Sequence, residues 1–248
     1  MARRTVFVTG AAQGIGAAVA LAFAREGYDV AVSSTLPDKL ADVLSRITAA
    51  GARAVPVLLD LRSQASIEQA MVQAATGLGA VDVLINNAGV ALKKKALEVT
   101  PEEWDGVMHT NLTGTFFMTQ QMGRYLAAQK RPGCIISMAS THGLVSMDSR
   151  AAYGIAKAGV MHMTRMLAYE WADLGIRVNA IAPGRVNTPS REASLADPGF
   201  RDFALGRVPM KRFAESEEVA AAACYLASPQ AAYITGQTLV LDGGLTAY

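Results

Sequence analysis

Short apolar runs alternate with longer segments of helical periodicity along this chain. Most of the runs are almost continuously apolar, which is typical of strands that are covered on both faces. We predict strands at residues 5–9, 30–33, 54–59, 83–86, 134–138, 177–181 and 238–241. In the segments between them, apolar positions recur at helical spacing. We predict helices near residues 14–26, 38–49, 64–76, 101–129, 150–174 and 215–227.

This alternation indicates a doubly wound α/β fold. Strands joined by helices lie parallel, with right-handed crossovers that place helices on both faces of the sheet. We therefore predict one domain over residues 1–248, built on a seven-stranded parallel sheet. The one long irregular segment, residues 183–209, contains several prolines and glycines. A connection of that length is often functional, so we predict that it covers a substrate.

Composition and charge narrow the class of protein. Of the 248 residues, 51% are apolar and 18% are charged, as in a globular protein with a sizeable core. The net charge of +2 and the lack of a basic stripe argue against nucleic acid as a partner. The N-terminal apolar run is only as long as a strand, too short for a signal peptide or a membrane-spanning helix. We therefore expect a cytoplasmic protein with no membrane partner.

The cysteines and histidines show no pattern that indicates metal binding. Cys134 and Cys224 lie in apolar segments, so we predict buried, unreactive thiols. His109, His142 and His162 are scattered and lack the spacing of metal ligands. We expect no metal site.

A glycine-rich turn follows the first predicted strand and opens the first predicted helix. Residues 9–16 read Thr-Gly-Ala-Ala-Gln-Gly-Ile-Gly, which places glycines at Gly10, Gly14 and Gly16. Glycines let the backbone approach a pyrophosphate, and the N-terminus of a helix attracts its negative charge. The spacing alone is a weak signal, and its strand–turn–helix setting is what supports a dinucleotide site.

The end of the second predicted strand bears on the choice of cofactor. An acidic residue there binds the ribose 2′-hydroxyl of NAD and repels a 2′-phosphate. This chain has Ser34 and Thr35 at that place, whose hydroxyls can donate to a phosphate. We therefore favour NADP(H) over NAD(H). Against this preference, Thr35 is not an arginine, and Gln13 stands where a basic residue would help.

Tyr153 and Lys157 are candidates for acid–base chemistry. They lie four residues apart in a predicted helix, which places them on one face. A free phenol has a pKa near 10, too high for efficient proton exchange at pH 7. A neighbouring ammonium ion stabilises the phenolate and lowers that pKa. Alone, this spacing describes many surface pairs, so its weight depends on the motifs around it.

Taken together, the motifs resemble those of the short-chain dehydrogenase/reductase family, in its compact branch. The resemblance covers residues 5–244. Within the family, the chain resembles 3-oxoacyl carrier-protein reductases as much as it resembles sugar and alcohol dehydrogenases. It is carried by the turn at residues 9–16, by Asp60 after the third strand, by Asn86-Asn87-Ala88-Gly89, by Asn111, by Ser140 thirteen residues before Tyr153, by residues 183–188, by residues 233–237 and by residues 241–244.

The resemblance implies a Rossmann fold, a homotetramer and a set of residue roles. The implied catalytic residues are Asn111, Ser140, Tyr153 and Lys157, with Tyr153 as the general acid or base in hydride transfer between NAD(P)(H) and a carbonyl or secondary alcohol. Lys157 would also hold the nicotinamide ribose. The implied cofactor-binding residues are Gly10, Gln13, Gly14, Ile15, Gly16, Ser34, Thr35, Asp60, Leu61, Asn87, Ala88, Gly89, Tyr153, Lys157, Pro183, Gly184, Val186 and Thr188.

The substrate is less clearly marked. His142 lies two residues past Ser140, and Arg150 and Arg191 fall near the expected pocket mouth. Because arginine forks suit carboxylates and phosphates, we hypothesise an acidic substrate. Arg185 is a further candidate by position, whereas Lys93-Lys94-Lys95 is more simply a solvated loop.

Two alternatives stay open at this point. The chain could be an NAD-dependent sugar or alcohol dehydrogenase that works mainly in oxidation. It could also be a non-catalytic nucleotide-binding regulator, although the presence of all four catalytic residues argues against this class. Epimerases and dehydratases of related folds are disfavoured by their different glycine spacing.

Overall fold

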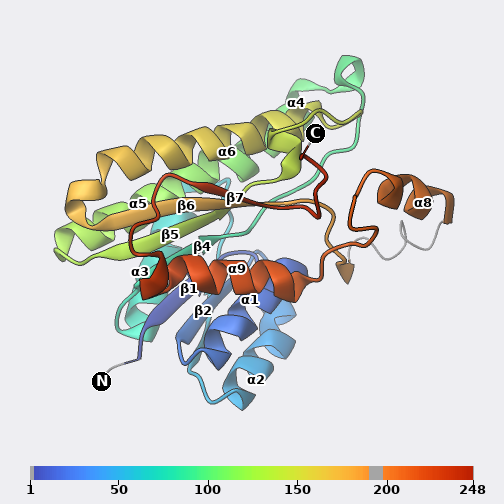
Figure 1. The fold of residues 1–248 in the computed structure, drawn as a ribbon. Helices are drawn as coiled ribbons and strands as arrows, with labels where there is room; N and C mark the ends of the chain where they lie inside the picture. The colour runs from blue at the N-terminus through green and yellow to red at the C-terminus, as the bar shows by residue number, and fades with distance from the viewer. Residues whose placement is uncertain (1–2, 190–197, 248) are drawn as a thin grey trace.

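The computed structural model describes residues 3–189 and 198–247, and it contains one seven-stranded parallel sheet (Figure 1). The strand order is β3-β2-β1-β4-β5-β6-β7, and every neighbouring pair is parallel. The predicted fold class is therefore confirmed. The strands are β1 (Thr5–Val8), β2 (Asp29–Ser34), β3 (Ala54–Leu58), β4 (Val83–Asn86), β5 (Gly133–Met138), β6 (Ile176–Pro183) and β7 (Thr238–Leu241).

Helices cover both faces of the sheet (Figure 1). Alternate side chains of β1 enter different cores, Val6 and Val8 one and Phe7 the other, because side chains of a strand alternate between faces. The first core is closed by α1 (Gly14–Arg25), α2 (Ala41–Ala49) and α9 (Ser216–Ala227). The second is closed by α3 (Gln64–Leu78), α5 (Gly114–Ala128) and α6 (Ala151–Glu170).

The helix predicted at residues 101–129 is divided in the structure. It consists of α4 (Pro101–Met108), a π-helical segment at His109–Thr113, and α5. The N-terminus of α4 carries a capping box in which Thr100 and Glu103 bond each other's backbone N–H. The π-helical segment contains Asn111, whose side chain is fully buried. Such segments often occur at functional sites.

Other boundaries also differ from the predicted ones. A 3-10 turn, Pro37–Leu40, precedes α2, and another, Ala172–Leu174, follows α6. The segment predicted as irregular, residues 183–209, contains the helix α8 (Pro198–Gly206), which stands apart from the sheet in Figure 1. Residues 190–197 of that segment lie outside the described residues. Its role as a substrate cover stays a prediction.

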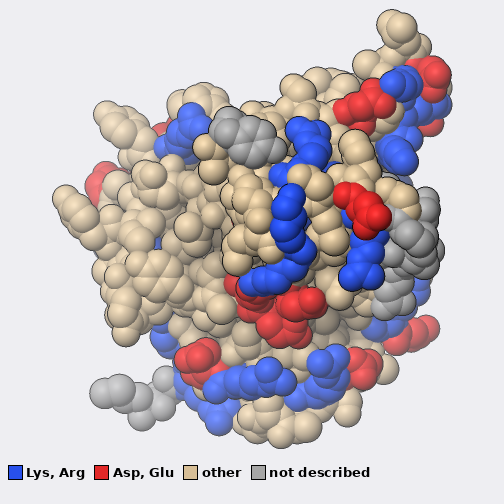
Figure 2. Space-filling view, turned by 45° about the vertical axis from the view of Figure 1, so that its right-hand side comes forward, with Lys and Arg blue, Asp and Glu red and all other residues tan. Residues whose placement is uncertain are grey.

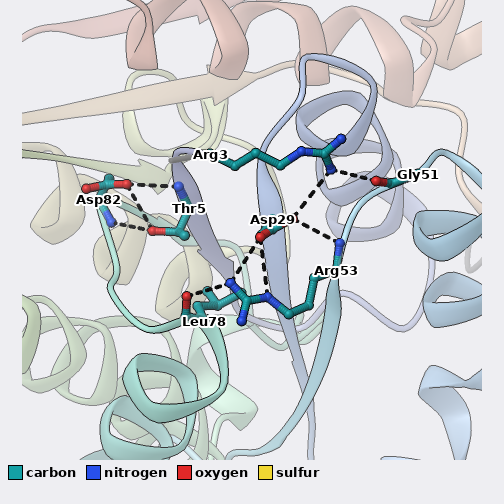
Figure 3. A network of polar contacts seen from close by, with 7 residues as sticks. All are labelled: Arg3, Thr5, Asp29, Gly51, Arg53, Leu78 and Asp82. Carbon is teal, nitrogen blue, oxygen red and sulfur yellow. Dashed lines mark hydrogen bonds and ion pairs between the residues drawn. The ribbon is translucent and has the colours of Figure 1, made fainter. Parts of the chain in front are cut away.

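A polar network joins the amino ends of β1, β2 and β3, away from the carboxyl ends of the strands (Figure 3). Asp29 accepts hydrogen bonds from the Arg53 backbone at 3.0 Å and from the Arg53 guanidinium at 3.1 and 3.3 Å. Burial alone raises the pKa of Asp29, but its bonds to Arg53 outweigh this and hold the pKa below its ordinary value. Nearby, Thr5 N–H donates to Asp82 at 2.9 Å. These contacts fix the strand ends opposite the candidate site.

The surface charge is mixed. Figure 2 shows one face on which lysine and arginine side chains lie beside acidic side chains, while an area on the left carries few charges. Positive charge on this face is thus interspersed with negative charge. None of the described helices is both long and apolar enough to cross a membrane.

Candidate active site

A long cleft lies at the carboxyl ends of the strands, where β1 and β4 are neighbours. The strand order reverses there, and crevices at such switch points are where open α/β sheets bind ligands. The cleft comprises a recess of about 710 Å³ and one of about 300 Å³. Because both are lined by Gln13, Asn87, Gly89, Val90 and Ala91, they form one continuous space.

The glycine turn forms the floor of this cleft. Gly10 has a φ of +64°, and a Cβ placed there would lie 2.6 Å from Cα of Ala88. A Cβ on Gly16 would collide with the carbonyl oxygen of Gly10 and with Nδ2 of Asn87. Asn87 Nδ2 itself donates to the carbonyls of Thr9 at 3.0 Å and Gly10 at 2.8 Å. The close approach of β1 and β4 therefore requires these glycines.

The N-terminus of α1 opens onto the turn and fits an anion. Gln13 at the N-cap makes no side-chain capping bond, and the first turn of α1 has no acidic residue. Backbone N–H groups at such a terminus favour negative charge. Gln13, Gly14, Ile15 and Gly16 all line the cleft, as predicted for a site that holds a pyrophosphate. The chain therefore has the cradle that a dinucleotide cofactor needs.

The larger recess contains the residues predicted to bind the adenosine half. Ser34, Thr35, Asp60 and Leu61 line it. Ser34 is the last residue of β2, so no carboxylate ends that strand. Asp60 binds the guanidinium of Arg62, whose hydrogen bonds lower the pKa of Asp60 although partial burial opposes them.

The smaller recess brings the predicted catalytic residues together. Ser140, after β5, and Tyr153 and Lys157, both from α6, line its wall. Lys157 Nζ lies 5.7 Å from the centre of the Tyr153 ring and donates to the Met138 carbonyl at 2.6 Å. Burial lowers the pKa of Lys157 to about 8. Its ammonium is therefore mostly charged at pH 7 and neutralises above pH 8.

Ser140 and His142 are oriented by local contacts. Ser140 Oγ accepts a hydrogen bond from the His142 backbone N–H at 3.2 Å. Because this bond uses the oxygen as acceptor, the hydroxyl hydrogen can be donated to a bound molecule. The His142 ring meets the edge of the Tyr153 ring at 5.9 Å between centres, with 74° between their planes. His142 thus borders Tyr153, and its predicted role toward the substrate stays a prediction.

Asn111 lies behind the cleft and does not line it. Its Oδ1 accepts from the Val90 backbone N–H at 2.9 Å, and its Nδ2 donates to the Val90 carbonyl at 2.7 Å. A Cβ on Gly89 would come within 2.6 Å of Asn111 Oδ1 and 3.7 Å of Lys157 Nζ. Asn111 therefore fixes the segment after β4 beside the lysine.

The segment after β6 completes the smaller recess. The predicted cofactor residues Pro183, Gly184, Val186 and Thr188 all line it. A Cβ on Gly14 would lie 3.6 Å from Cγ2 of Thr188, which places this segment opposite the glycine turn.

The described arginines that were predicted to bind the substrate do not lie together in the cleft. Arg150 Nη1 donates to the Leu92 carbonyl at 3.1 Å, and Arg150 does not line either recess. Arg185 lines a separate recess beside Asp242. Arg191 lies outside the described residues. The acidic-substrate hypothesis therefore stays a prediction.

The cysteines differ from each other in burial. Cys134 is buried as predicted, and burial raises its pKa to about 11. Cys224 is only partly buried, contrary to the prediction, because it faces a groove between α1 and α9. Burial still raises its pKa to about 12, so both thiols are poor nucleophiles at pH 7. Within residues 3–189 and 198–247, no group of three or more His, Cys, Asp or Glu side chains could hold a metal ion.

Sequence reasoning missed three contributors to this site. Thr9 Oγ1 accepts the backbone N–H groups of Asn87 at 3.0 Å and Ala88 at 3.1 Å, which ties β1 to the segment after β4. The Met138 carbonyl holds Lys157, and no side-chain signal marks a backbone acceptor. Arg62 lines the larger recess. Its place two residues after Asp60 was the only available signal.

Comparisons with known proteins agree with this geometry. A family model described as enoyl-(acyl carrier protein) reductase matches residues 10–246. The chain is 39% identical to 3beta-hydroxysteroid dehydrogenase 1 of Eggerthella lenta over 99% of its length and 94% of that protein. It is 37% identical to glucose 1-dehydrogenase of Gluconobacter oxydans, over 100% of this chain and 93% of that protein. It is 36% identical to the 3-oxoacyl-[acyl-carrier-protein] reductase of Thermotoga maritima, over 98% of this chain and 97% of that protein.

Solved structures show the same architecture. A protein of Sinorhizobium meliloti, provisionally described as a short-chain alcohol dehydrogenase, superposes with a TM-score of 0.96 at 37% identity, over 100% of this chain and 98% of that one. A protein of Agrobacterium tumefaciens, provisionally described as a 2-deoxy-D-gluconate 3-dehydrogenase and solved with bound NADP, superposes with a TM-score of 0.92. The two chains are 35% identical, over 99% of this chain and 97% of that one. The chain belongs to the short-chain dehydrogenase/reductase family of NAD(P)-dependent oxidoreductases, which act on CH–OH and C=O groups.

Proposed function

We propose that this chain interconverts a carbonyl and a secondary alcohol with Tyr153 as the general acid or base. The observation that carries the proposal is that Ser140, Tyr153 and Lys157 share one recess with the glycine turn. The bound nicotinamide supplies the hydride chemistry. The chain's own residues then have to position the reacting oxygen and move one proton.

Each of the four predicted catalytic residues has a defined task in this proposal. Tyr153 gives its phenol proton to the carbonyl oxygen during reduction and takes a proton from the alcohol during oxidation. The Lys157 ammonium, 5.7 Å from the ring, favours the phenolate and binds the nicotinamide ribose. The Ser140 hydroxyl donates to the same substrate oxygen and stabilises its developing charge. Asn111 acts as a positioning residue through Val90.

Substrate oxidation or reduction tests this function. The purified protein is incubated with each nicotinamide cofactor and a panel of sugars, sugar acids, steroid and cyclic alcohols and 3-oxoacyl thioesters, and nicotinamide absorbance is followed. We expect turnover with at least one class, because the proton-transfer residues are already gathered at the cofactor cleft. Tight cofactor binding with no turnover across the panel would instead support the non-catalytic regulator. The panel also decides between a ketoreductase and a dehydrogenase that works mainly in oxidation.

We further propose NADP(H) as the preferred cofactor. β2 ends at Ser34 with no carboxylate to repel a 2′-phosphate, and Asp38 does not line the recess. A related structure was solved with bound NADP. Hydrogen bonds to a charged phosphate contribute about 1.5–3 kcal/mol. In fluorescence titrations we therefore expect NADPH to bind at least about tenfold more tightly than NADH, and equal or reversed affinities would contradict the preference.

A homotetramer is the proposed assembly. Ile155, Met166 and Tyr169 lie along one face of α6 and are 51%, 50% and 89% exposed. Apolar side chains aligned on a helix in this way are typical of an interface. Light scattering should give four times the 26.1 kDa chain mass, and Tyr169→Glu should lower that mass. A monomeric wild-type protein would contradict this assembly. The cytoplasmic location stays a prediction from the sequence.

A further inference from the structure

The recess at the adenosine end of the cleft contains a cation that the proposed function leaves unexplained. Among the described residues that line it, Arg62 is the only lysine or arginine. The same recess is lined by Ser34, Thr35 and Asp60. Its acidic side chains are Asp60 and Glu103, and because Glu103 pairs with Lys94 at 2.8 Å, Asp60 is the charge that an entering anion needs offset.

Asp60 holds the guanidinium group of Arg62 through only some of its N–H donors. Its Nε donates to Asp60 Oδ1 at 3.0 Å, and its Nη2 donates to Asp60 Oδ2 at 2.7 Å. This bidentate contact uses one edge of the fork. The hydrogens of Nη1 and the second hydrogen of Nη2 point away from Asp60, and the side chain is 65% exposed. A second anion can therefore bind along the open edge while the Asp60 carboxylate keeps its contact with Nε and Nη2.

The loop after β3, which carries Arg62, follows a strand that pairs with the end of β2. In the sheet Ser34 pairs with Leu58, and the Leu59 N–H donates to the Ser34 carbonyl at 3.1 Å. The two strand ends therefore continue side by side into the recess. The Arg62 backbone N–H donates to Asp60 Oδ1 at 2.9 Å, which fixes a tight turn after β3. Ser34 and Arg62 line the same recess.

Charge also favours an anion at this place only because Arg62 is present. An ionised Asp60 would repel a phosphate group beside it, and its contact with Arg62 neutralises that charge. A serine hydroxyl alone offers one neutral donor, whereas an arginine fork matches a phosphate with two parallel charged donors. Arg62 therefore offsets the charge of Asp60 and offers the remaining N–H donors of its guanidinium group to the phosphate.

We propose that Arg62 binds the 2′-phosphate of NADP(H) and thereby sets the cofactor preference of this chain. The proposal rests on the NADP(H) preference proposed above. It assigns the binding of the 2′-phosphate to a residue after β3. Thr35 and Gln13, which stand where a basic residue would help, carry no charge.

Equilibrium titrations of R62Q test this assignment. Glutamine keeps a polar side chain but removes the charge and the fork. We expect the Kd for NADPH to rise by at least about tenfold and the Kd for NADH to change by less than about twofold. The matched control is R46Q, which removes an exposed arginine of α2 that pairs with Asp42 and does not line the cleft. It should leave both constants unchanged.

Competition with nucleotide fragments isolates the phosphate contribution. Adenosine 2′,5′-bisphosphate should lose affinity for R62Q, and adenosine 5′-monophosphate should not. Equal weakening of NADPH and NADH would overturn the proposal, because Arg62 would then act on the adenine or on the shape of the recess. Unchanged constants would overturn it as well. If wild-type protein favours NADPH and R62Q keeps the same ratio, only the role of Arg62 fails. If wild-type protein favours NADH, the cofactor preference fails and this role fails with it.

Discussion

Replacing Tyr153 with phenylalanine should lower kcat by at least about 10²-fold, the usual contribution of a positioned acid or base. The change removes one oxygen and keeps the ring that meets His142 edge to face at 5.9 Å between centres. Cofactor binding should change little, because the glycine turn and the Lys157 amine stay in place. Steady-state kinetics in both directions, with a titration of NADPH, measures the two effects separately.

The matched control for this variant is Tyr169→Phe. Tyr169 lies on the same helix α6 but is 89% exposed and does not line the cleft. It should keep wild-type kcat in the assembled protein. Near-normal turnover in Y153F, with normal cofactor binding, would remove Tyr153 from the proton transfer and leave another group to perform it.

Replacing Lys157 with methionine should have a comparable effect on alcohol oxidation. Two unit charges 5.7 Å apart, the distance from Lys157 Nζ to the Tyr153 ring centre, interact by about 3 kcal/mol at an effective dielectric of about 20. That energy corresponds to about 100-fold in the ionisation of the phenol. Oxidation needs the phenolate, so we expect kcat at pH 7 to fall by about 100-fold. The Kd for the cofactor should also rise, because the ribose loses a partner.

The pH dependence distinguishes this electrostatic role from a purely structural one. Burial lowers the pKa of Lys157 to about 8, so wild-type protein carries the ammonium charge below pH 8 and loses it above. The ratio of wild-type to K157M rates should therefore be largest below pH 8 and shrink as pH rises through 8. A ratio that stays constant with pH would show that the lysine only holds the cofactor.

A matched control separates this effect from the loss of a buried polar group. Thr164, also buried on α6, donates to the Val160 carbonyl at 2.9 Å. Thr164→Val should leave the pH profile unchanged. Thermal unfolding of K157M and T164V, compared with wild type, shows whether either variant loses stability enough to affect the rates.

Local pattern predicted most of the elements. The continuous apolar character of the strands is a consequence of burial on both faces, and it is visible in short segments such as Val83–Asn86. The division of the helix at residues 101–129 was not predicted. It coincides with the paired bonds between Asn111 and Val90, twenty-one residues apart, and no local periodicity reports such a contact.

For the candidate site, the cofactor-binding residues were predicted better than the substrate-binding residues. The predicted cofactor-binding residues all line the cleft, because most of them belong to motifs that are contiguous in the sequence. Arg150 was expected near the substrate, yet its guanidinium binds the Leu92 carbonyl. A position near a pocket in the sequence does not determine the direction of a long side chain, since that depends on the acceptors available around it.

By itself, the sequence determined the strand and helix alternation and the glycine turn, and it predicted a set of candidate residues for the chemistry. The tertiary structure decided which strands are neighbours, and the pairing of β1 with β4 brings Gly10 against Ala88 at the carboxyl ends of these strands, where the cleft lies. It also decided that Lys157 is buried against the Met138 carbonyl and that Arg62 lines the larger recess. Burial and charge pairing depend on segments that are distant in the sequence. Only the folded chain brings those segments within the few ångströms over which such interactions act.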